Sequence, residues 1–462
     1  MAQPTSSAVR RPRKVLRWIL IVVLVLLLAA GAGAGWWMYQ NRADPVPAGT
    51  PARPAAATVQ PSIVPVSSNA PAPTPRGVQK ALATPLKDPA LGKLTGEVSD
   101  PLTGQVLWSQ GAAEPRVPAS NAKILTASAV LLALPHDSRV TTKVVLGSDG
   151  EAILVGAGDP TLTSTPVGET SFYSDPGHLS ELAAQIKRSG RKVTSIAVDT
   201  SLFTGPTMQP TWDRRDIEGG DIAPIESLMV DGGRIKPSEE YSPRTTEPAL
   251  DAGRALADEL GLNSPVTEAT APSAAPEIAS VQSAPLTVRV GDMMRYSDNV
   301  LAESLGIELA RATGGEASIE GGSQAVLATL SKNGFAARTA TLVDSSGLSY
   351  SDRVPASLLD ELMSSAAGDG QPKLRSLLDS LPVAHGTGTL SDRFDPKLTD
   401  GAGWVRGKTG TLTGVSSLTG IVQTVDGRVL SFAMISGGTS PADARPAVDA
   451  VVGALRDCGC RS

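Results

Sequence analysis

The stretch Ser120-Asn-Ala-Lys123, followed by the apolar run Ile124-Leu-Thr-Ala-Ser-Ala-Val-Leu-Leu132, decides how this chain is interpreted. The run is apolar enough to predict a buried helix with Ser120 in its first turn. Residues three apart lie on one face of a helix, so we expect the Ser120 hydroxyl and the Lys123 amine to meet. A serine hydroxyl needs a neighbouring base to become a nucleophile, and a neutral lysine can be that base.

Two more short motifs follow along the chain, Ser297-Asp-Asn299 and Lys408-Thr-Gly410. The first joins two segments with helical periodicity, Val288–Arg295 and Val300–Ala312. A polar triplet between two apolar helices predicts a loop that presents its side chains to a cleft. The second motif lies in a predicted strand, Val405–Leu412.

Strands and helices around these motifs predict an α+β fold, an antiparallel sheet flanked by helices. Leu94–Val98 and Gln105–Ser109 form one predicted hairpin. Ser417–Val425 and Arg428–Ser436 form another, and the Asp426-Gly427 pair between them predicts a type I′ turn. A closing helix is expected at Pro441–Leu455.

The N-terminal region predicts a membrane anchor and a tether. Residues 15–39 contain a membrane-length apolar stretch with five basic and no acidic residues at or before its start. The positive-inside rule then places residues 1–14 in the cytoplasm and the catalytic domain outside, on a single-pass protein of the cell membrane. The alternative is a cleaved signal peptide and a secreted protein, because the small residues 29–35 resemble a cleavage region. Residues 40–81, rich in Pro, Ala, Thr and Ser, predict a disordered linker.

The pattern of predicted strands, helices and turns in the remaining chain indicates one main domain interrupted by an insertion. The main domain is expected in two parts, 82–139 and 286–462, with an inserted domain at 140–285 that is rich in short strands and turns. Strands are expected at Thr142–Leu146, Glu151–Val155 and Val193–Val198, and a helix at Leu179–Arg188. The last part of the insertion, 263–284, is rich in Pro, Ala and Ser, and we expect it to be mobile.

Composition excludes several classes of function. The net charge is −5 although the first 17 residues contribute +5, and an acidic ectodomain argues against nucleic-acid binding. The only cysteines, Cys458 and Cys460, are too few for a four-ligand zinc site. The sequence leaves open whether they pair in an oxidising compartment, where so close a pair would be strained, and we expect a frayed tail. With three histidines and no matching motif, no Ser-His-Asp arrangement is expected, and His385 is interpreted as a surface or structural residue. Two further triplets of the form Ser-x-Asn lie at 67–69, in the linker, and at 331–333, in a turn. A further Ser-x-x-Lys lies at 189–192, at the end of a helix.

In this order and context the three motifs resemble those of the class C low-molecular-mass penicillin-binding proteins, the D-alanyl-D-alanine carboxypeptidase/endopeptidase family. The resemblance covers roughly Leu82–Leu455. Well-known members carry two inserted domains, whereas the insertion of about 145 residues here predicts one domain plus connectors. Further segments that resemble the family are Gly156–Leu162, Asp199–Phe203, Trp212, Ala223–Leu228, Asp344–Ser349 and Leu381–Ala384.

The resemblance implies a penicillin-binding/serine β-lactamase-like fold and acyl transfer at a D-Ala-D-Ala bond of peptidoglycan stem peptides. β-Lactams would acylate the same serine, and no metal or organic cofactor is implied. The backbone N–H groups of Ser120 and Thr411 would stabilise the oxyanion. The implied catalytic residues are Ser120 (nucleophile), Lys123 (base) and Ser297 (proton relay to the leaving amine). The implied substrate-binding residues are Asn299 for the substrate amide, and Lys408, Thr409, Gly410 and Thr411, of which Lys408, Thr409 and Thr411 would recognise the terminal carboxylate.

Two alternatives share these motifs. A serine β-lactamase would differ in rapid deacylation, and the large insertion disfavours it. A non-catalytic, membrane-anchored β-lactam sensor or wall-binding module is the alternative outside enzymes. About 14 residues precede the apolar stretch, too few to fold as an output domain, so a sensor would need a signalling partner. The sequence leaves the balance between carboxypeptidase and endopeptidase activity open.

Overall fold

The computed structural model describes residues 69–395, 397 and 399–460. These residues belong to one compact unit. The predicted cytoplasmic segment (1–14), the apolar stretch (15–39) and most of the linker (40–81) lie outside the described residues. Within the described ranges, no helix combines the length and the apolar character needed to cross a bilayer. The linker prediction extended too far, because α2 (Pro75–Leu82) is already helical and buries Val78 and Leu82.

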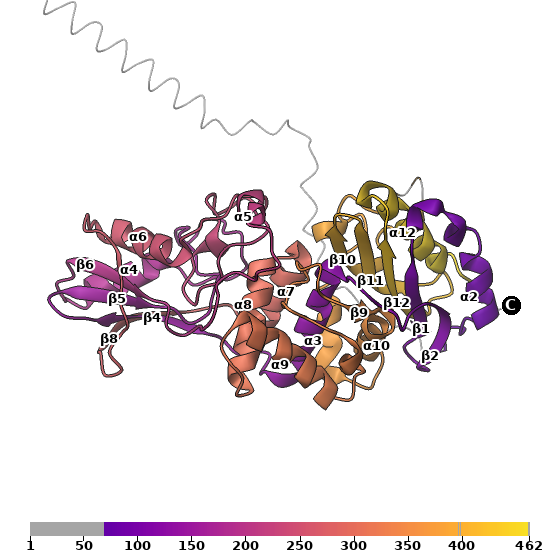
Figure 1. Cartoon of the computed structure of the whole chain (residues 1–462), viewed down its shortest axis with the longest axis horizontal. Coiled ribbons are helices and arrows are strands. Elements are labelled where there is room, and N and C mark those ends of the chain that lie inside the picture. The colour runs from indigo at the N-terminus through magenta and orange to yellow at the C-terminus, as the bar shows by residue number, and fades with distance from the viewer. Residues whose placement is uncertain (1–68, 396, 398, 461–462) are drawn as a thin grey trace, which may run out of the picture. The chain divides into compact units, whose positions relative to one another are not determined.

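An antiparallel five-stranded sheet forms the main part, in the order β10-β11-β12-β1-β2 (Figure 1). β10 is therefore an edge strand, and its free side can border a cleft. Both expected hairpins form, but the second is not closed by a type I′ turn. Only Gly427 has a positive φ (87°), whereas type I′ requires positive φ at both central residues. The strands are β1 (Thr95–Asp100), β2 (Gln105–Gln110), β10 (Val405–Leu412), β11 (Val415–Gln423) and β12 (Val429–Gly437).

Side chains of β12 alternate between two cores, as the two-residue period of a strand requires. Phe432 and Met434 face the core that contains Val451 and Leu455 of α12 (Pro441–Arg456). Ala433 and Ile435 face the opposite core, which other helices of the main part build. These helices are α3 (Ala122–Ala133), α7 (Leu286–Tyr296), α8 (Asn299–Ala312), α9 (Ile319–Lys332), α10 (Ala356–Ala367) and α11 (Arg375–Asp379).

Helix α3 lies inside this second core, which explains its continuous apolar sequence. Every residue from Ala122 to Leu132 is buried. Ser120 belongs to a short 3-10 turn, η3 (Ala119–Asn121), that leads directly into α3. The helix is thereby fixed in place, and it carries Lys123 one turn below Ser120.

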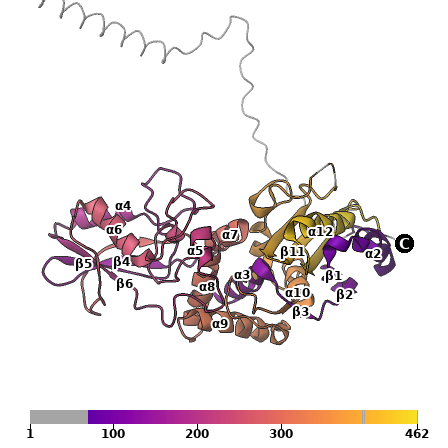
Figure 2. The same ribbon diagram turned by 45° about the horizontal axis from the view of Figure 1, so that its top comes forward.

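Between the two parts of the main domain the chain builds a second sheet, in the order β7-β6-β5-β4-β8. Figures 1 and 2 show it set apart from the first sheet, with α8 between them. β5–β6 and β6–β7 are parallel, and the other pairs are antiparallel. Two helices, α4 (Leu179–Arg188) and α6 (Pro248–Leu260), contribute to its separate core. The strands are β4 (Thr141–Leu146), β5 (Glu151–Val155), β6 (Ser195–Asp199), β7 (Thr267–Glu268) and β8 (Glu277–Gln282).

Two expectations about less regular segments were wrong. The segment 263–284, expected to be mobile, supplies β7 and β8, and β8 pairs along β4. The described part of the C-terminal tail, which ends at Cys460, is not frayed, because Cys458 is buried and the Thr74 N–H donates to the Cys460 carbonyl (2.7 Å). Cys458 and Cys460 are paired as a disulfide. The remaining short strands are β3 (Pro115–Arg116) and β9 (Val354–Pro355), which pair with each other.

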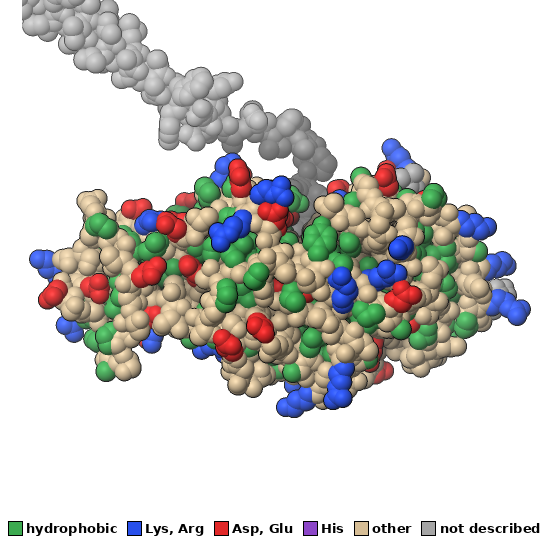
Figure 3. All heavy atoms as spheres, viewed as in Figure 1, with side chains coloured by type: hydrophobic (Ala, Val, Ile, Leu, Met, Phe, Trp, Pro, Cys, Tyr) green, Lys and Arg blue, Asp and Glu red, His purple; other side chains and the backbone are tan. Residues whose placement is uncertain are grey.

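The connection after β6 packs on the helices of the main part. Trp212 and Ile217, the latter in α5 (Arg215–Gly219), share a core with Val300 and Ile307 of α8. The segment is thus held against the helix that begins at the Ser297-Asp-Asn299 loop. On the face seen in Figure 3, acidic and basic side chains are interspersed.

Candidate active site

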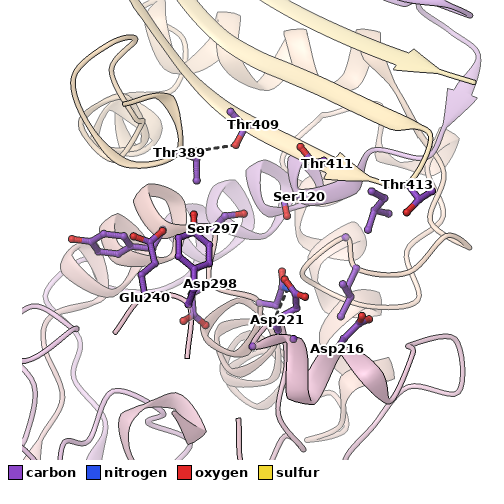
Figure 4. A pocket seen from close by; sticks show the side chains of 18 of the residues that line it. Ser120, Asp216, Asp221, Glu240, Ser297, Asp298, Thr389, Thr409, Thr411 and Thr413 are labelled. Carbon is purple, nitrogen blue, oxygen red and sulfur yellow. Dashed lines mark hydrogen bonds between the residues drawn. The ribbon is translucent and has the colours of Figure 1, made fainter. Parts of the chain in front are cut away.

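A cleft of about 1110 Å³ lies between β10, the Ser297-Asp-Asn299 loop and the connection that contains α5. Ser120, Ser297 and Asn299 line it, together with Thr409 and Thr411 of β10. Figure 4 shows Ser120 on its helix between the β10 threonines and the carboxylates Asp216 and Asp221. The two motif lysines do not line the cleft but lie buried behind it.

Lys123 is fully buried and donates to three acceptors. Its Nζ lies 3.1 Å from Ser120 Oγ, 2.5 Å from Asn299 Oδ1 and 2.7 Å from the Ser346 carbonyl oxygen. An ammonium group has three N–H donors, so this environment satisfies the protonated form completely. The first two contacts bring together Ser120, Lys123 and Asn299, which the sequence assigns to one site.

Burial nevertheless lowers the pKa of Lys123 to about 8, because a low-dielectric interior disfavours the charged amine. Nearby carboxyl groups oppose this effect and keep the pKa from falling further. At pH 7 roughly a tenth of the molecules then carry neutral Lys123, which can accept a proton from Ser120. The opposing carboxyl groups, strongest first, are those of Asp344, Glu303, Asp298 and Asp221.

Ser297 lies between α7 and α8 in the left-handed region, with φ 57°. Its Oγ accepts a hydrogen bond from Lys408 Nζ at 2.8 Å. Lys408 Nζ donates also to the Thr409 carbonyl (2.7 Å), so this buried amine has two acceptors among the described residues. Burial holds the pKa of Lys408 well below its usual range, and the charge on Lys123 lowers it further.

Both polar atoms of the Asn299 side-chain amide form hydrogen bonds. Oδ1 accepts from Lys123, and Nδ2 donates to the backbone carbonyl of Asp221 (2.9 Å). The side chain therefore fixes the position of Lys123 and ties the α5 connection to the site. A substrate amide could bind Asn299 only by displacing one of these partners, so the role expected from the sequence needs a rearrangement of this contact.

Gly410 lies where β10 comes close to the backbone of residues 118–120, which leaves no room for a side chain. A Cβ at this position would lie 2.8 Å from the Pro118 carbonyl oxygen and 3.1 Å from the Ser120 nitrogen. β10 thus passes directly beside the backbone of Ser120, which brings the Ser120 and Thr411 segments together. The hydroxyl of Thr409 donates to Thr389 (2.7 Å), a contact visible in Figure 4.

A buried ionic cluster around Asp298, between the two catalytic-motif residues Ser297 and Asn299, was not foreseen from the sequence. One carboxylate oxygen caps α8 by accepting from Leu301 N (2.9 Å). The other accepts from Arg234 Nη2 (2.9 Å), Tyr173 OH (2.9 Å) and Arg244 Nη2 (3.4 Å). Both arginines come from the inserted region, and the two side chains are almost inaccessible. The inserted region therefore holds the loop that carries Ser297 and Asn299.

The segment 344–349, one of those that resemble the family, forms a turn beneath Lys123. Asp344 is buried and accepts from Gly347 N (2.7 Å), Ser349 N (2.9 Å) and Trp212 Nε1 (2.8 Å). This turn points the Ser346 carbonyl at Lys123. Asp159 likewise closes a turn, accepting from Thr161 N at 2.9 Å. His385 is exposed and lies outside the cleft lining.

Comparisons with known proteins agree with this geometry. The chain matches the D-Ala-D-Ala carboxypeptidase 3 (S13) family over residues 78–244 and 238–458. It is 49% identical over 409 residues to carboxypeptidase Rv3627c of Mycobacterium tuberculosis, covering 87% of this chain and 88% of the relative. It is 48% identical over 431 residues to carboxypeptidase DacB of Mycolicibacterium smegmatis, covering 91% and 92%.

Among solved structures, penicillin-binding protein 4 (dacB) of Haemophilus influenzae is similar, with a TM-score of 0.67, 21% identity, and coverage of 84% of this chain and 99% of that chain. This likeness confirms the α+β fold expected from the motifs. The family match and the two close relatives confirm the resemblance. The chain belongs to the D-Ala-D-Ala carboxypeptidase 3 (S13) family.

Proposed function

We propose that this protein is a serine D-Ala-D-Ala carboxypeptidase that acts on peptidoglycan stem peptides through an acyl-enzyme on Ser120. The observation that carries the proposal is the contact of Ser120 Oγ with the buried Lys123 amine, at 3.1 Å, on the wall of an open cleft. A second serine–lysine contact, Ser297 with Lys408, faces the same cleft. Two hydroxyls, each hydrogen-bonded to a buried amine, can carry out the two proton transfers that peptide cleavage needs.

Acylation begins when neutral Lys123 takes the proton of Ser120. The Ser120 oxygen then bonds to the carbonyl carbon of the penultimate D-alanine, and the negative oxygen accepts hydrogen bonds from the N–H groups of Ser120 and Thr411. The approach of β10 to the Ser120 backbone at Gly410 supports this pairing of donors. When the peptide C–N bond breaks, a proton passes through Ser297 to the departing amine, and D-alanine leaves.

Water then attacks the acyl-enzyme ester, releasing the shortened peptide and restoring Ser120. A β-lactam presents an amide carbonyl to Ser120, and its ring opens instead of releasing a separate amine. Its acyl-enzyme is therefore expected to persist. A solved complex of the Haemophilus influenzae relative contains a β-lactam, which supports β-lactam binding by a protein of this fold.

The test of this function is release of D-alanine from a peptide that ends in D-Ala-D-Ala, measured beside penicillin binding. Release of D-alanine by wild-type protein and none by Ser120→Ala is the expected result. Rapid consumption of penicillin would instead favour a β-lactamase. Stable penicillin binding without release of D-alanine would favour a sensor or binding module. A cross-linked dimer of stem peptides as second substrate measures the endopeptidase activity.

We also propose that residues 15–39 anchor the chain in the cell membrane, with the catalytic domain outside and residues 40 to about 74 as its tether. The support is the apolar length of the segment and the basic residues before it. Fractionation of cells that express the full chain tests this proposal. Recovery in membranes with an intact N-terminus is expected, and a shortened protein in the culture medium would show signal cleavage instead.

A further inference from the structure

Five arginines line the cleft, and four of them form ion pairs with carboxylates of the protein. Arg445 is the exception, because no carboxylate of the described residues lies within ion-pair distance of it. An arginine without a carboxylate partner in a substrate cleft has a positive charge that can bind an anion. The four pairs are Arg215 with Asp213, Arg234 and Arg244 with Asp298, and Arg393 with Asp449.

Arg445 lies near the start of α12 and reaches β10. Its Nη2 donates to Thr411 Oγ1 at 3.1 Å, and its side chain is exposed to the cleft. The Thr411 oxygen acts as acceptor in this contact, so the hydroxyl hydrogen remains available to a ligand. The guanidinium also keeps further N–H donors. Together the two side chains present several donors and one positive charge at the β10 edge of the cleft.

The motif lysine cannot supply this charge at the surface of the cleft. Lys408 is fully buried, does not line the cleft, and uses its amine on Ser297 Oγ and the Thr409 carbonyl. The expectation that Lys408 recognises the terminal carboxylate therefore does not fit its environment. Thr411 remains well placed for that role, and the cation beside it is Arg445.

We infer that Arg445, with Thr411, binds the free carboxylate of the D-amino acid that leaves, and so selects substrates with an unblocked C-terminus. This inference rests on the proposed function. The planar guanidinium can form two parallel hydrogen bonds to a carboxylate, which a primary amide cannot accept in the same way. The carboxylate on the fused ring of a penicillin would occupy the same position.

The experiment compares an N-acylated tripeptide ending in D-Ala-D-Ala with the same tripeptide as its C-terminal carboxamide. The full-length protein is used as wild type, Arg445→Ala, Arg445→Lys and Arg406→Ala. Arg406 is an exposed arginine of β10 outside the cleft lining. Arg406→Ala therefore removes the same charge as Arg445→Ala, but outside the cleft. In Arg445→Ala we expect kcat/KM for the acid to fall roughly 10- to 100-fold, mainly through KM, with little change for the amide.

Arg445→Lys should recover part of the preference for the acid, and Arg406→Ala should keep the wild-type preference. Equal losses on both substrates in Arg445→Ala, no loss on the acid, or the same loss of preference in Arg406→Ala would overturn the inference. Wild-type protein that cleaves neither substrate would overturn the proposed function itself. Thermal unfolding of each variant shows whether a loss of activity is a loss of fold, and a folded Arg445→Ala with unchanged preference contradicts the inference directly.

Discussion

The two walls of the cleft each contain a buried lysine beside a serine hydroxyl, but they surround these lysines differently. On the helical wall, Lys123 has three acceptors and four carboxyl groups close enough to raise its pKa. On the β10 wall, Lys408 has two acceptors, and Lys123 is the charge that acts on it. The comparison teaches that the surroundings, rather than the motif, determine the pKa of each amine. Carboxyl groups around Lys123 limit the fall of its pKa to about 8, whereas burial and the charge on Lys123 hold the pKa of Lys408 well below its usual range.

The two walls are connected through the Ser297-Asp-Asn299 loop. Ser297 contacts Lys408, Asn299 contacts Lys123, and Asp298 between them binds the arginines of the inserted region. The loop therefore fixes the relative positions of both amines. This arrangement gives the inserted region a structural part in the site, whatever else it contributes.

Removal of the base should give the largest effect. With Lys123→Ala, no side chain among the described residues is left in a hydrogen bond with Ser120 Oγ to accept its proton, and we expect acylation by penicillin to slow by about 10²- to 10⁴-fold. Stopped-flow or quenched mass spectrometry of the folded variant measures this rate. Lys408→Ala serves as the comparison, since Ser120 keeps its base. A greater loss in Lys408→Ala than in Lys123→Ala would reverse the assignment of the two lysines.

Removal of the bridge between the walls should affect stability. Asp298→Ala leaves Arg234 and Arg244 buried without their carboxylate, which costs about 3–5 kcal/mol of unfolding free energy. Urea unfolding measures it. The matched control is Asp251→Ala, which removes an exposed pair with Arg254 and should cost about 1 kcal/mol or less. Similar costs for both variants would show that the buried cluster does not hold the loop.

The pH dependence of acylation should report the pKa of Lys123 on the helical wall. Because the pKa of Lys123 is lowered to about 8 and its neutral form is the base, the rate should rise with pH and level off above about 8. Between pH 7 and the plateau we expect an increase of roughly tenfold. Measurement of the acylation rate constant from pH 6 to 10 gives the midpoint. A rate that falls over this range would contradict the assignment of Lys123 as base.

Glu303→Gln should give the smallest effect, a shift of that midpoint. Glu303 is buried one turn along α8 from Asn299, and its carboxyl raises the pKa of Lys123. Removal of this charge should move the midpoint to lower pH by less than about one unit. The shift is partial because burial raises the pKa of Glu303 itself to about 8, so its charge is incomplete over the same range. A midpoint that moves to higher pH would contradict the arrangement of charges.

Local patterns predicted the elements that carry the motifs. The apolar run predicted α3, and β10 has the predicted bounds. A helix that is buried on all sides and a strand that pairs at the edge of a sheet each leave a recognisable pattern within a short segment. Asp-Gly located a turn but not its type, since Asp426 does not adopt positive φ. β8 was missed because its order comes from pairing with β4, more than a hundred residues earlier.

The parts of the site that the sequence did not reveal depend on distant partners. Arg234 and Arg244 meet Asp298 from 64 and 54 residues away, and nothing in their local sequence marks them as buried. Arg445 meets Thr411 across 34 residues, in a helix whose pattern indicates only packing. The motif also suggested that Lys408 contacts substrate, whereas the fold places it behind the cleft wall. Motifs thus predicted which groups react, while the charged side chains around those groups required the structure.

Intact-mass spectrometry of the full-length protein over time with penicillin tests the central claim most directly. We predict an adduct of one drug molecule that persists in wild type, is absent in Ser120→Ala, and maps to the peptide that contains Ser120. An adduct that survives in folded Ser120→Ala, or no adduct and no loss of drug with folded wild type, would contradict the assignment of Ser120 as the nucleophile.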